Sequence, residues 1–145
     1  MNSLKDDLKQ KHGYILPPHP KASGSVTMYL EGYPTEDDEP MSATEFHGRQ
    51  ISNLSTMLIA FFGYEEKVYI GTDSFIYYRP GAPSKCVVPD VYVVFGVDAI
   101  PARCSFYTWA EGAVPAVALE FLFEGTKSTD RHDKPKLYLQ EIGMQ

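Results

Sequence analysis

The region after Pro40 has the spacing of apolar positions that is typical of an amphipathic helix. Four apolar side chains and one histidine recur at intervals of four, three, four and three residues: His47, Ile51, Leu54, Leu58 and Phe61. This spacing brings them to one face of a helix. Ser42 and Glu45 have the separation of a capping box, and Gly63 is a natural end for the helix. We therefore expect a helix over residues 43–62.

The middle of the chain is rich in β-branched and aromatic residues, which favour strands. Two short strands are expected over residues 67–70 and 74–78, and residues 25–30 are compatible with a third. The runs 87–95 and 114–123 are too continuously apolar for a sheet with one wet face. They therefore predict strands that are covered on both faces.

The two ends of the chain differ in character. Residues 1–40 are interrupted by five prolines and are expected to be irregular. Residues 131–142 predict a helix with Pro135 in its first turn. This order of elements predicts an α/β or α+β layer fold, and 145 residues correspond to about one domain, taken as residues 1–145.

Composition narrows the class of protein. Hydrophobic residues make up 43% and charged residues 22% of the chain, which is ordinary for a globular protein. The net charge of −6 argues against a strongly basic nucleic-acid coat protein, but it leaves room for a local basic cleft. Cys86 and Cys104 lack zinc-site spacing, and the N-terminus lacks the apolar run of a signal peptide. We therefore expect a cytoplasmic protein.

Two lone carboxylates stand inside strongly apolar runs. Asp90 follows Pro89 in the run 87–95, and Glu120 lies in the run 114–123. A buried carboxylate is costly unless it is paired, hydrogen-bonded or bound to a metal ion. If the two strands are neighbours, both carboxylates can converge on Mg²⁺, which prefers oxygen ligands. The alternative is that each carboxylate faces solvent or pairs with a basic residue.

Several short segments follow one another in a distinctive order: Val88–Val94, Trp109–Gly112 with Pro115, Ala118–Glu120, and the series Thr126, Asp130, Lys134 and Tyr138. In this order they resemble the Uma-type family of restriction endonucleases, which belongs to the PD-(D/E)XK nuclease superfamily. It covers about residues 38–145. The resemblance implies a restriction-endonuclease-like fold, in which helices flank a mixed central β-sheet. It also implies hydrolysis of DNA with Mg²⁺ or Mn²⁺ as cofactor.

The resemblance also implies roles for individual residues. Asp90 and Glu120 match the acidic metal ligands, and Lys134 matches a helix lysine that contacts phosphate or orients water. Glu45 is placed like an acidic residue that assists with the metal, although capping of the helix is an equal alternative for it. His47 lies on the apolar stripe and is expected to be a packed core histidine. Four more basic residues are candidates for a positive surface: Arg103, Lys127, Arg131 and Lys136.

Two departures from the family pattern open a second interpretation. Leu122 stands where the superfamily has a lysine, and the chain ends at Gln145 before the family's next strand. A shortened member of this kind would expose a sheet edge, which a homodimer or a companion chain would cover. The alternative to an endonuclease is therefore a noncatalytic protein that keeps the nuclease fold and binds a partner.

Overall fold

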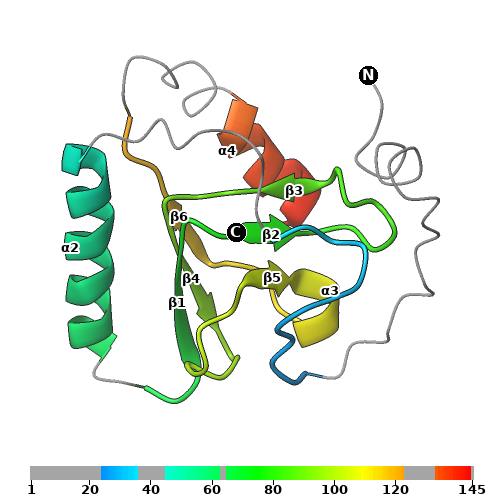
Figure 1. Cartoon of the computed structure of the whole chain (residues 1–145), viewed down its shortest axis with the longest axis horizontal. Helices are drawn as coiled ribbons and strands as arrows, with labels where there is room; N and C mark the ends of the chain where they lie inside the picture. Colours follow the sequence, from blue (N-terminus) through cyan, green and yellow to red (C-terminus); the bar gives the residue numbers. More distant parts are fainter. Residues whose placement is uncertain (1–23, 36–44, 63–64, 123–132, 145) are drawn as a thin grey trace.

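The computed structural model describes residues 24–35, 45–62, 65–122 and 133–144 (Figure 1). Its elements are α2 (Glu45–Phe62), β1 (Val68–Thr72), β2 (Phe75–Tyr77), β3 (Cys86–Val87), β4 (Val91–Phe95), β5 (Ser105–Tyr107), α3 (Thr108–Glu111), β6 (Val117–Leu119), α4 (Lys134–Lys136) and η2 (Leu137–Ile142). The segment η2 continues α4 with wider, π-helical turns. Helices and strands together make the α+β class that the sequence predicts.

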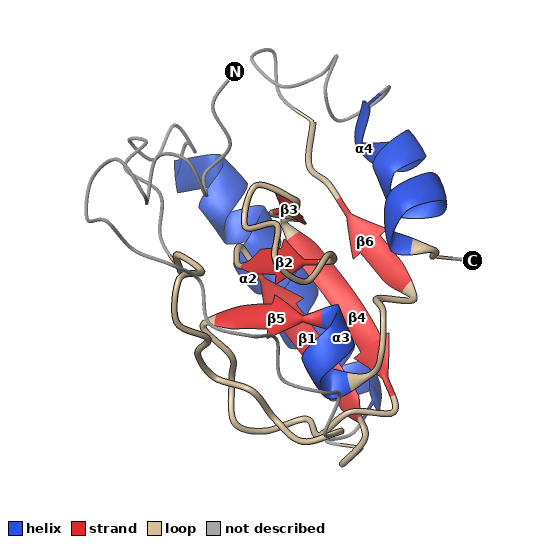
Figure 2. Ribbon diagram, turned by 90° about the vertical axis from the view of Figure 1, so that its right-hand side faces the viewer, coloured by secondary structure: helices blue, strands red, loops and turns tan. Residues whose placement is uncertain are grey.

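The strands in the described part of the chain form two three-stranded sheets. In the first sheet, β4 lies between β1 and β6 and is antiparallel to both. In the second, β2 is antiparallel to β3 and parallel to β5, which gives the mixed strand directions that were expected. The strands of the second sheet run across those of the first (Figure 2). α2 packs on β1 and β4, and α4 lies beyond β6.

The apolar run 87–95 is divided between the two sheets. β3 ends at Val87, and β4 begins at Val91 in the other sheet. Pro89 has no N–H to donate, so a continuous ladder cannot pass through it. Residues 91–94 are all buried, as expected for a strand that is covered on both faces. The division at Pro89 leaves Asp90 at the junction of the two sheets.

Some expected elements are shorter or absent. The described part of the run 114–123, which ends at Leu122, forms a strand only over Val117–Leu119, and residues 25–30 form no strand. β5 and α3 had no clear signal in the sequence. α3 ends at Gly112, whose φ of 75° suits glycine because it has no Cβ. The C-terminal helix ends at Ile142 and has Pro135 in its first turn, as predicted, whereas its predicted start at residue 131 lies outside the described residues.

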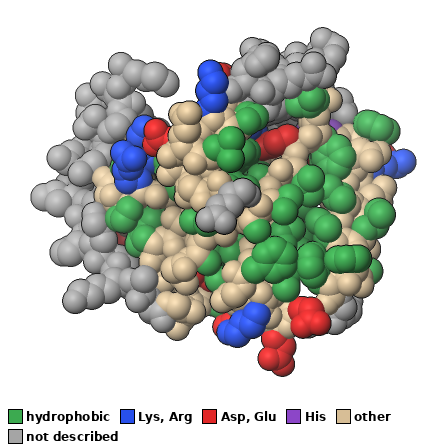
Figure 3. Space-filling model, turned by 180° about the vertical axis from the view of Figure 1, so that it is seen from behind, with side chains coloured by type: hydrophobic (Ala, Val, Ile, Leu, Met, Phe, Trp, Pro, Cys, Tyr) green, Lys and Arg blue, Asp and Glu red, His purple; other side chains and the backbone are tan. Residues whose placement is uncertain are grey.

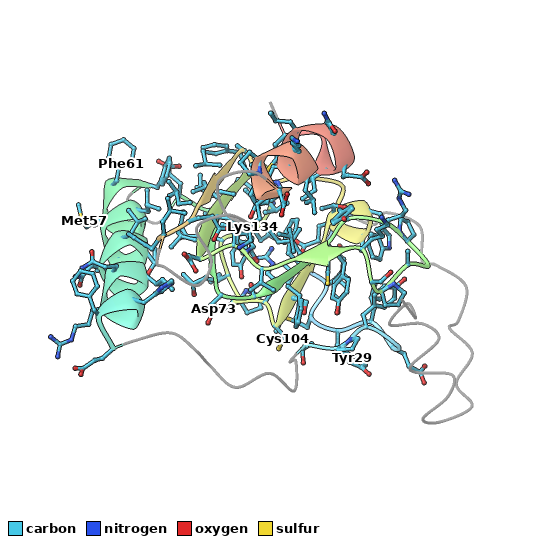
Figure 4. The ribbon with its side chains drawn as sticks, turned by 90° about the horizontal axis from the view of Figure 1, so that it is seen from above. Tyr29, Met57, Phe61, Asp73, Cys104 and Lys134 are labelled. Carbon is cyan, nitrogen blue, oxygen red and sulfur yellow. The ribbon has the colours of Figure 1, made fainter. Side chains whose placement is uncertain are left out.

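The apolar stripe of α2 ends differently from the prediction. The side chain of Phe61 is 81% exposed, and Phe62 packs inward instead, with its ring centroid 5.7 Å from that of Phe95. A helix with 3.6 residues per turn allows either a three- or a four-residue step after Leu58. Met57 and Phe61 project from the outer side of α2 (Figure 4), and apolar side chains gather on the rear face of the molecule (Figure 3).

None of the described helices is both long and apolar enough to cross a membrane.

Three buried tyrosines fasten the segment 24–35 to the second sheet. Tyr77 donates its hydroxyl proton to the carbonyl of Pro34, and the N–H of Leu30 donates to the Tyr107 hydroxyl at 3.3 Å. The hydroxyl of Tyr33 accepts a hydrogen bond from the N–H of Gly81 at 2.8 Å. The Tyr33 ring lies edge-on to Tyr77 and Tyr107. Buried hydroxyls need such partners, so the segment completes this part of the core.

Candidate active site

Asp90 and Glu120 stand at the ends of two paired strands. The ladder between β4 and β6 aligns Val91 with Leu119, so Asp90 and Glu120 occupy the next pair of positions. Residues directly opposite each other in antiparallel strands have Cβ atoms about 4.5–5.5 Å apart. The Phe121 N–H donates to Oδ2 of Asp90 at 2.6 Å, so the Asp90 side chain reaches the residue next to Glu120. The two carboxylates therefore belong to one cluster.

The Asp90 carboxylate is held from two directions. Its side chain is 14% exposed, and Oδ1 lies 3.1 Å from Nε2 of His47 on α2. Oδ2 accepts the hydrogen bond from Phe121. The ring of His47 also lies edge-on to that of Phe121, with centroids 6.1 Å apart. A carboxylate has about four acceptor positions, and these two contacts use half of them.

The Glu120 carboxylate is held by residues of the C-terminal helix. Its side chain is 11% exposed. The Tyr138 hydroxyl donates to Oε1 at 2.7 Å, and Nζ of Lys134 lies 3.0 Å from the same oxygen. Lys134 Nζ also donates to the carbonyl of Val88 at 3.4 Å. In the view from above, Lys134 lies near the centre of the molecule (Figure 4).

The pKa of Glu120 reflects its burial and its neighbours. Burial raises this pKa above its usual range, and the charge of Asp90 raises it further. The hydrogen bond from Tyr138 and the ammonium of Lys134 oppose that rise in pKa without cancelling it. A cation bound between the two carboxyl groups would lower the pKa of Glu120 and favour its ionised form.

The structure brings together only some of the residues that the resemblance singled out. Lys134 joins Glu120, whereas Glu45 pairs with Arg49 on the solvent side of α2, where 81% of the Glu45 side chain is exposed. His47 is buried, as expected, but its partner is the Asp90 carboxylate as well as an aromatic ring. The sequence pattern alone does not predict this contact. Its one available signal was a polar residue on an otherwise apolar stripe.

Arg103 was expected to contribute to a positive surface, and that prediction is wrong. Its side chain is fully buried and forms two hydrogen bonds to Glu111, at 2.8 and 3.3 Å. Its guanidinium also lies 4.1 Å from the centroid of the Tyr69 ring. Lys136 is exposed, whereas Lys127 and Arg131 lie outside the described residues.

The cluster can be compared with the needs of Mg²⁺. Within the described ranges, no three His, Cys, Asp or Glu side chains form a group that could hold a metal ion. Mg²⁺ does not require such a cage, because it is commonly bound by one or two carboxylates and keeps several waters. The carboxylate oxygens of Asp90 and Glu120 are ligands that fit this ion. An arriving cation would compete with Lys134 for Glu120.

A comparison with protein families identifies one match. The family model "Uma2: Putative restriction endonuclease" matches residues 29–145. This range includes every residue of the cluster, from His47 to Tyr138. No curated protein and no solved structure matches the chain.

Proposed function

We propose, since the chain belongs to the Uma2 family, that it is a Mg²⁺-dependent endonuclease which hydrolyses DNA phosphodiester bonds. The family description indicates a nuclease-type function, and DNA is the substrate of such an enzyme. One observation carries the proposal beyond the family match. Asp90 and Glu120 occupy opposite positions just beyond the ends of paired strands, and the Lys134 ammonium lies 3.0 Å from a carboxylate oxygen of Glu120.

In this proposal, Asp90 and Glu120 hold the metal ion. A bound Mg²⁺ supplies an activated water and neutralises charge on the phosphate. The contacts from His47 and Phe121 hold the Asp90 carboxylate, and the Tyr138 hydroxyl holds that of Glu120. Each carboxylate therefore keeps a set direction before any ligand arrives, which lowers the entropic cost of binding.

Lys134 is the proposed phosphate contact. Its ammonium comes from α4, whereas the carboxylates come from strand ends, so the helix and the sheet would face the phosphate together. An ammonium acts as a compact point charge with three donors on a flexible stem. It can therefore transfer its hydrogen bond from Glu120 to a phosphate oxygen and stabilise the charge that develops there.

A second candidate function is noncatalytic binding through the same fold. Leu122, two residues after Glu120, is 41% exposed at the position where the superfamily has a lysine. In this alternative, the Lys134 ammonium permanently takes the place of a metal ion beside Glu120. The protein would then bind DNA or a companion chain without cleaving a bond.

Metal-dependent melting distinguishes the two functions. Wild type, Asp90→Asn and the matched control Asp98→Asn would be melted with 0–10 mM Mg²⁺ or Mn²⁺, a range on the order of ordinary Mg²⁺ assays. Asp98 is a suitable control because it is an exposed carboxylate that pairs with Lys67. The endonuclease proposal expects a rise in Tm for wild type and Asp98→Asn only, together with nicking of supercoiled DNA. A wild type without any metal effect would refute it.

A further inference from the structure

His47 is an unusual residue for its place on α2. It is 8% exposed and is the only residue in the described helix that is buried to this degree. Four apolar side chains of α2 are only half-buried: Ile51, Leu54, Leu58 and Phe62. An apolar residue would satisfy packing at this position without bringing a polar ring into the interior. The histidine is therefore explained better by its polar contact than by its volume.

That contact has a definite geometry. His47 Nε2 lies 3.1 Å from Oδ1 of Asp90, and the Phe121 N–H lies 2.6 Å from Oδ2. One donor comes from α2 and the other from the backbone beyond β6, so they approach the carboxylate from different elements. Hydrogen bonds to both oxygens fix the rotation of the carboxylate about its Cβ–Cγ bond. The unused lone pairs then point in a set direction.

We propose that His47 is a positioning residue that orients the Asp90 carboxylate for a divalent cation. This inference rests on the proposed function, because it assigns Asp90 as a metal ligand. In it, the Nε2–H tautomer donates to Oδ1, and the Phe121 N–H completes the clamp. Partners that hold a metal ligand in place typically change metal affinity by 10–100-fold when they are removed.

Two substitutions separate orientation from packing. His47→Leu keeps an apolar side chain of comparable bulk on the stripe but removes the donor. His47→Gln keeps an N–H donor at a similar reach from the helix. Mn²⁺ affinity would be measured by calorimetry on the full chain, with the free energy of unfolding measured in urea without metal. Ile51→Val, a half-buried neighbour on the same face, serves as the packing control.

The expected result is a split between stability and metal binding. His47→Leu should stay folded with a modest loss of unfolding free energy, because the Asp90 carboxylate loses one donor, but it should bind Mn²⁺ about 10–100-fold more weakly. His47→Gln should recover most of that affinity, and Ile51→Val should leave it unchanged. If the leucine variant does not fold, His47→Met provides the same comparison.

Two results would overturn the inference while leaving the proposed function intact. The first is a folded His47→Leu or His47→Met variant that binds Mn²⁺ as tightly as wild type. The second is a folded His47→Gln variant that binds as weakly as the leucine variant. Failure of the proposed function looks different, because the wild type itself would then bind no Mn²⁺, or Asp90→Asn would bind it equally well.

Discussion

Nζ of Lys134 lies 3.0 Å from Oε1 of Glu120, so the C-terminal helix supplies the cation that faces the acidic end of β6. Only 21% of the Lys134 side chain is exposed, and a second contact joins it to the carbonyl of Val88. The lysine therefore lies between the two strand ends that carry Asp90 and Glu120. This placement assigns it a different role from a lysine on an exposed helix face.

Replacing Lys134 should impair DNA cleavage selectively. In the proposed endonuclease, Lys134→Met removes a donor to the phosphate and should lower kcat by about 100-fold. Lys136→Met is a matched control, since this lysine lies on the same helix but is exposed. Single-turnover cleavage of a labelled duplex would measure both variants. Equal losses in the two variants would indicate a general effect of charge rather than a role at the site.

Neutralising Glu120 should stabilise the fold at neutral and alkaline pH. Its pKa is raised in the folded protein, mainly by burial, so folding favours the protonated form. The stability that this provides is fully present below the ordinary value of 4.5 and is lost as the pH rises through the raised pKa. Glu120→Gln should therefore exceed wild type in unfolding free energy at pH 8, and the difference should shrink towards pH 4.

Urea unfolding across that pH range tests this expectation. Glu141→Gln is the control, because Glu141 pairs with Arg79 at the surface and its side chain is 41% exposed. The gain in unfolding free energy at pH 8 should be confined to Glu120→Gln. A Glu120→Gln variant that is less stable than wild type at pH 8 would show that the bond to Lys134 outweighs the cost of burial.

A side chain at residue 71 should severely disturb the first sheet. Gly71 pairs with Tyr92 across β1 and β4, and a Cβ at Gly71 would lie 2.1 Å from Cζ of Tyr92. Overpacking typically costs about 1–3 kcal/mol, and Tyr92 is fully buried, so Gly71→Ala should cost about 3 kcal/mol. Gly48→Ala is the contrasting variant, because a Cβ there meets nothing within 4 Å.

Denaturant melts would compare these two glycine variants. Gly48→Ala lies in the interior of α2 and should gain up to about 1 kcal/mol from helix propensity. The double variant Gly71→Ala/Tyr92→Leu should lose less than the sum of its single changes, because the clash is removed. Additive losses would locate the damage elsewhere than at the Tyr92 ring.

Breaking the buried Arg103–Glu111 pair should be costly. Both side chains are at most 1% exposed. Arg103→Met leaves the buried carboxyl group of Glu111 without its two hydrogen bonds, which typically costs about 3–5 kcal/mol. Replacing both partners with apolar residues, as in Arg103→Met/Glu111→Leu, should recover much of that loss. Equilibrium unfolding of the three proteins measures the difference, and a neutral Arg103→Met would contradict the prediction.

The longer helices and strands can be predicted from the local sequence pattern. The apolar stripe predicts α2, and the aromatic and β-branched runs predict β1, β2 and β4. These patterns are visible because the elements bury one face or both. The short β5 and α3 were missed, since three or four residues are too few to show a period. The distribution of strands between two sheets depends on long-range pairing, which local pattern does not encode.

Only some residues and contacts of the candidate site could be predicted from the sequence. Asp90 and Glu120 stood out because carboxylates in apolar runs are costly. The contact between His47 and Asp90 joins residues 43 positions apart and became visible only once α2 was placed on the sheet. The burial of Arg103 was not predicted, because it depends on a buried ion pair with Glu111 that the sequence around Arg103 does not indicate. The expected homodimer or companion chain stays a prediction.

The tyrosine contacts to residues 24–35 also make this segment part of the folded unit. A fragment beginning at α2 would leave the hydroxyls of Tyr77 and Tyr107 without Pro34 and Leu30 as partners. It would also remove the Tyr33 ring from the aromatic core. Shortened versions of this protein should therefore begin before residue 24. A tag or fusion partner joined directly at Glu45 would replace part of the core rather than extend a free end.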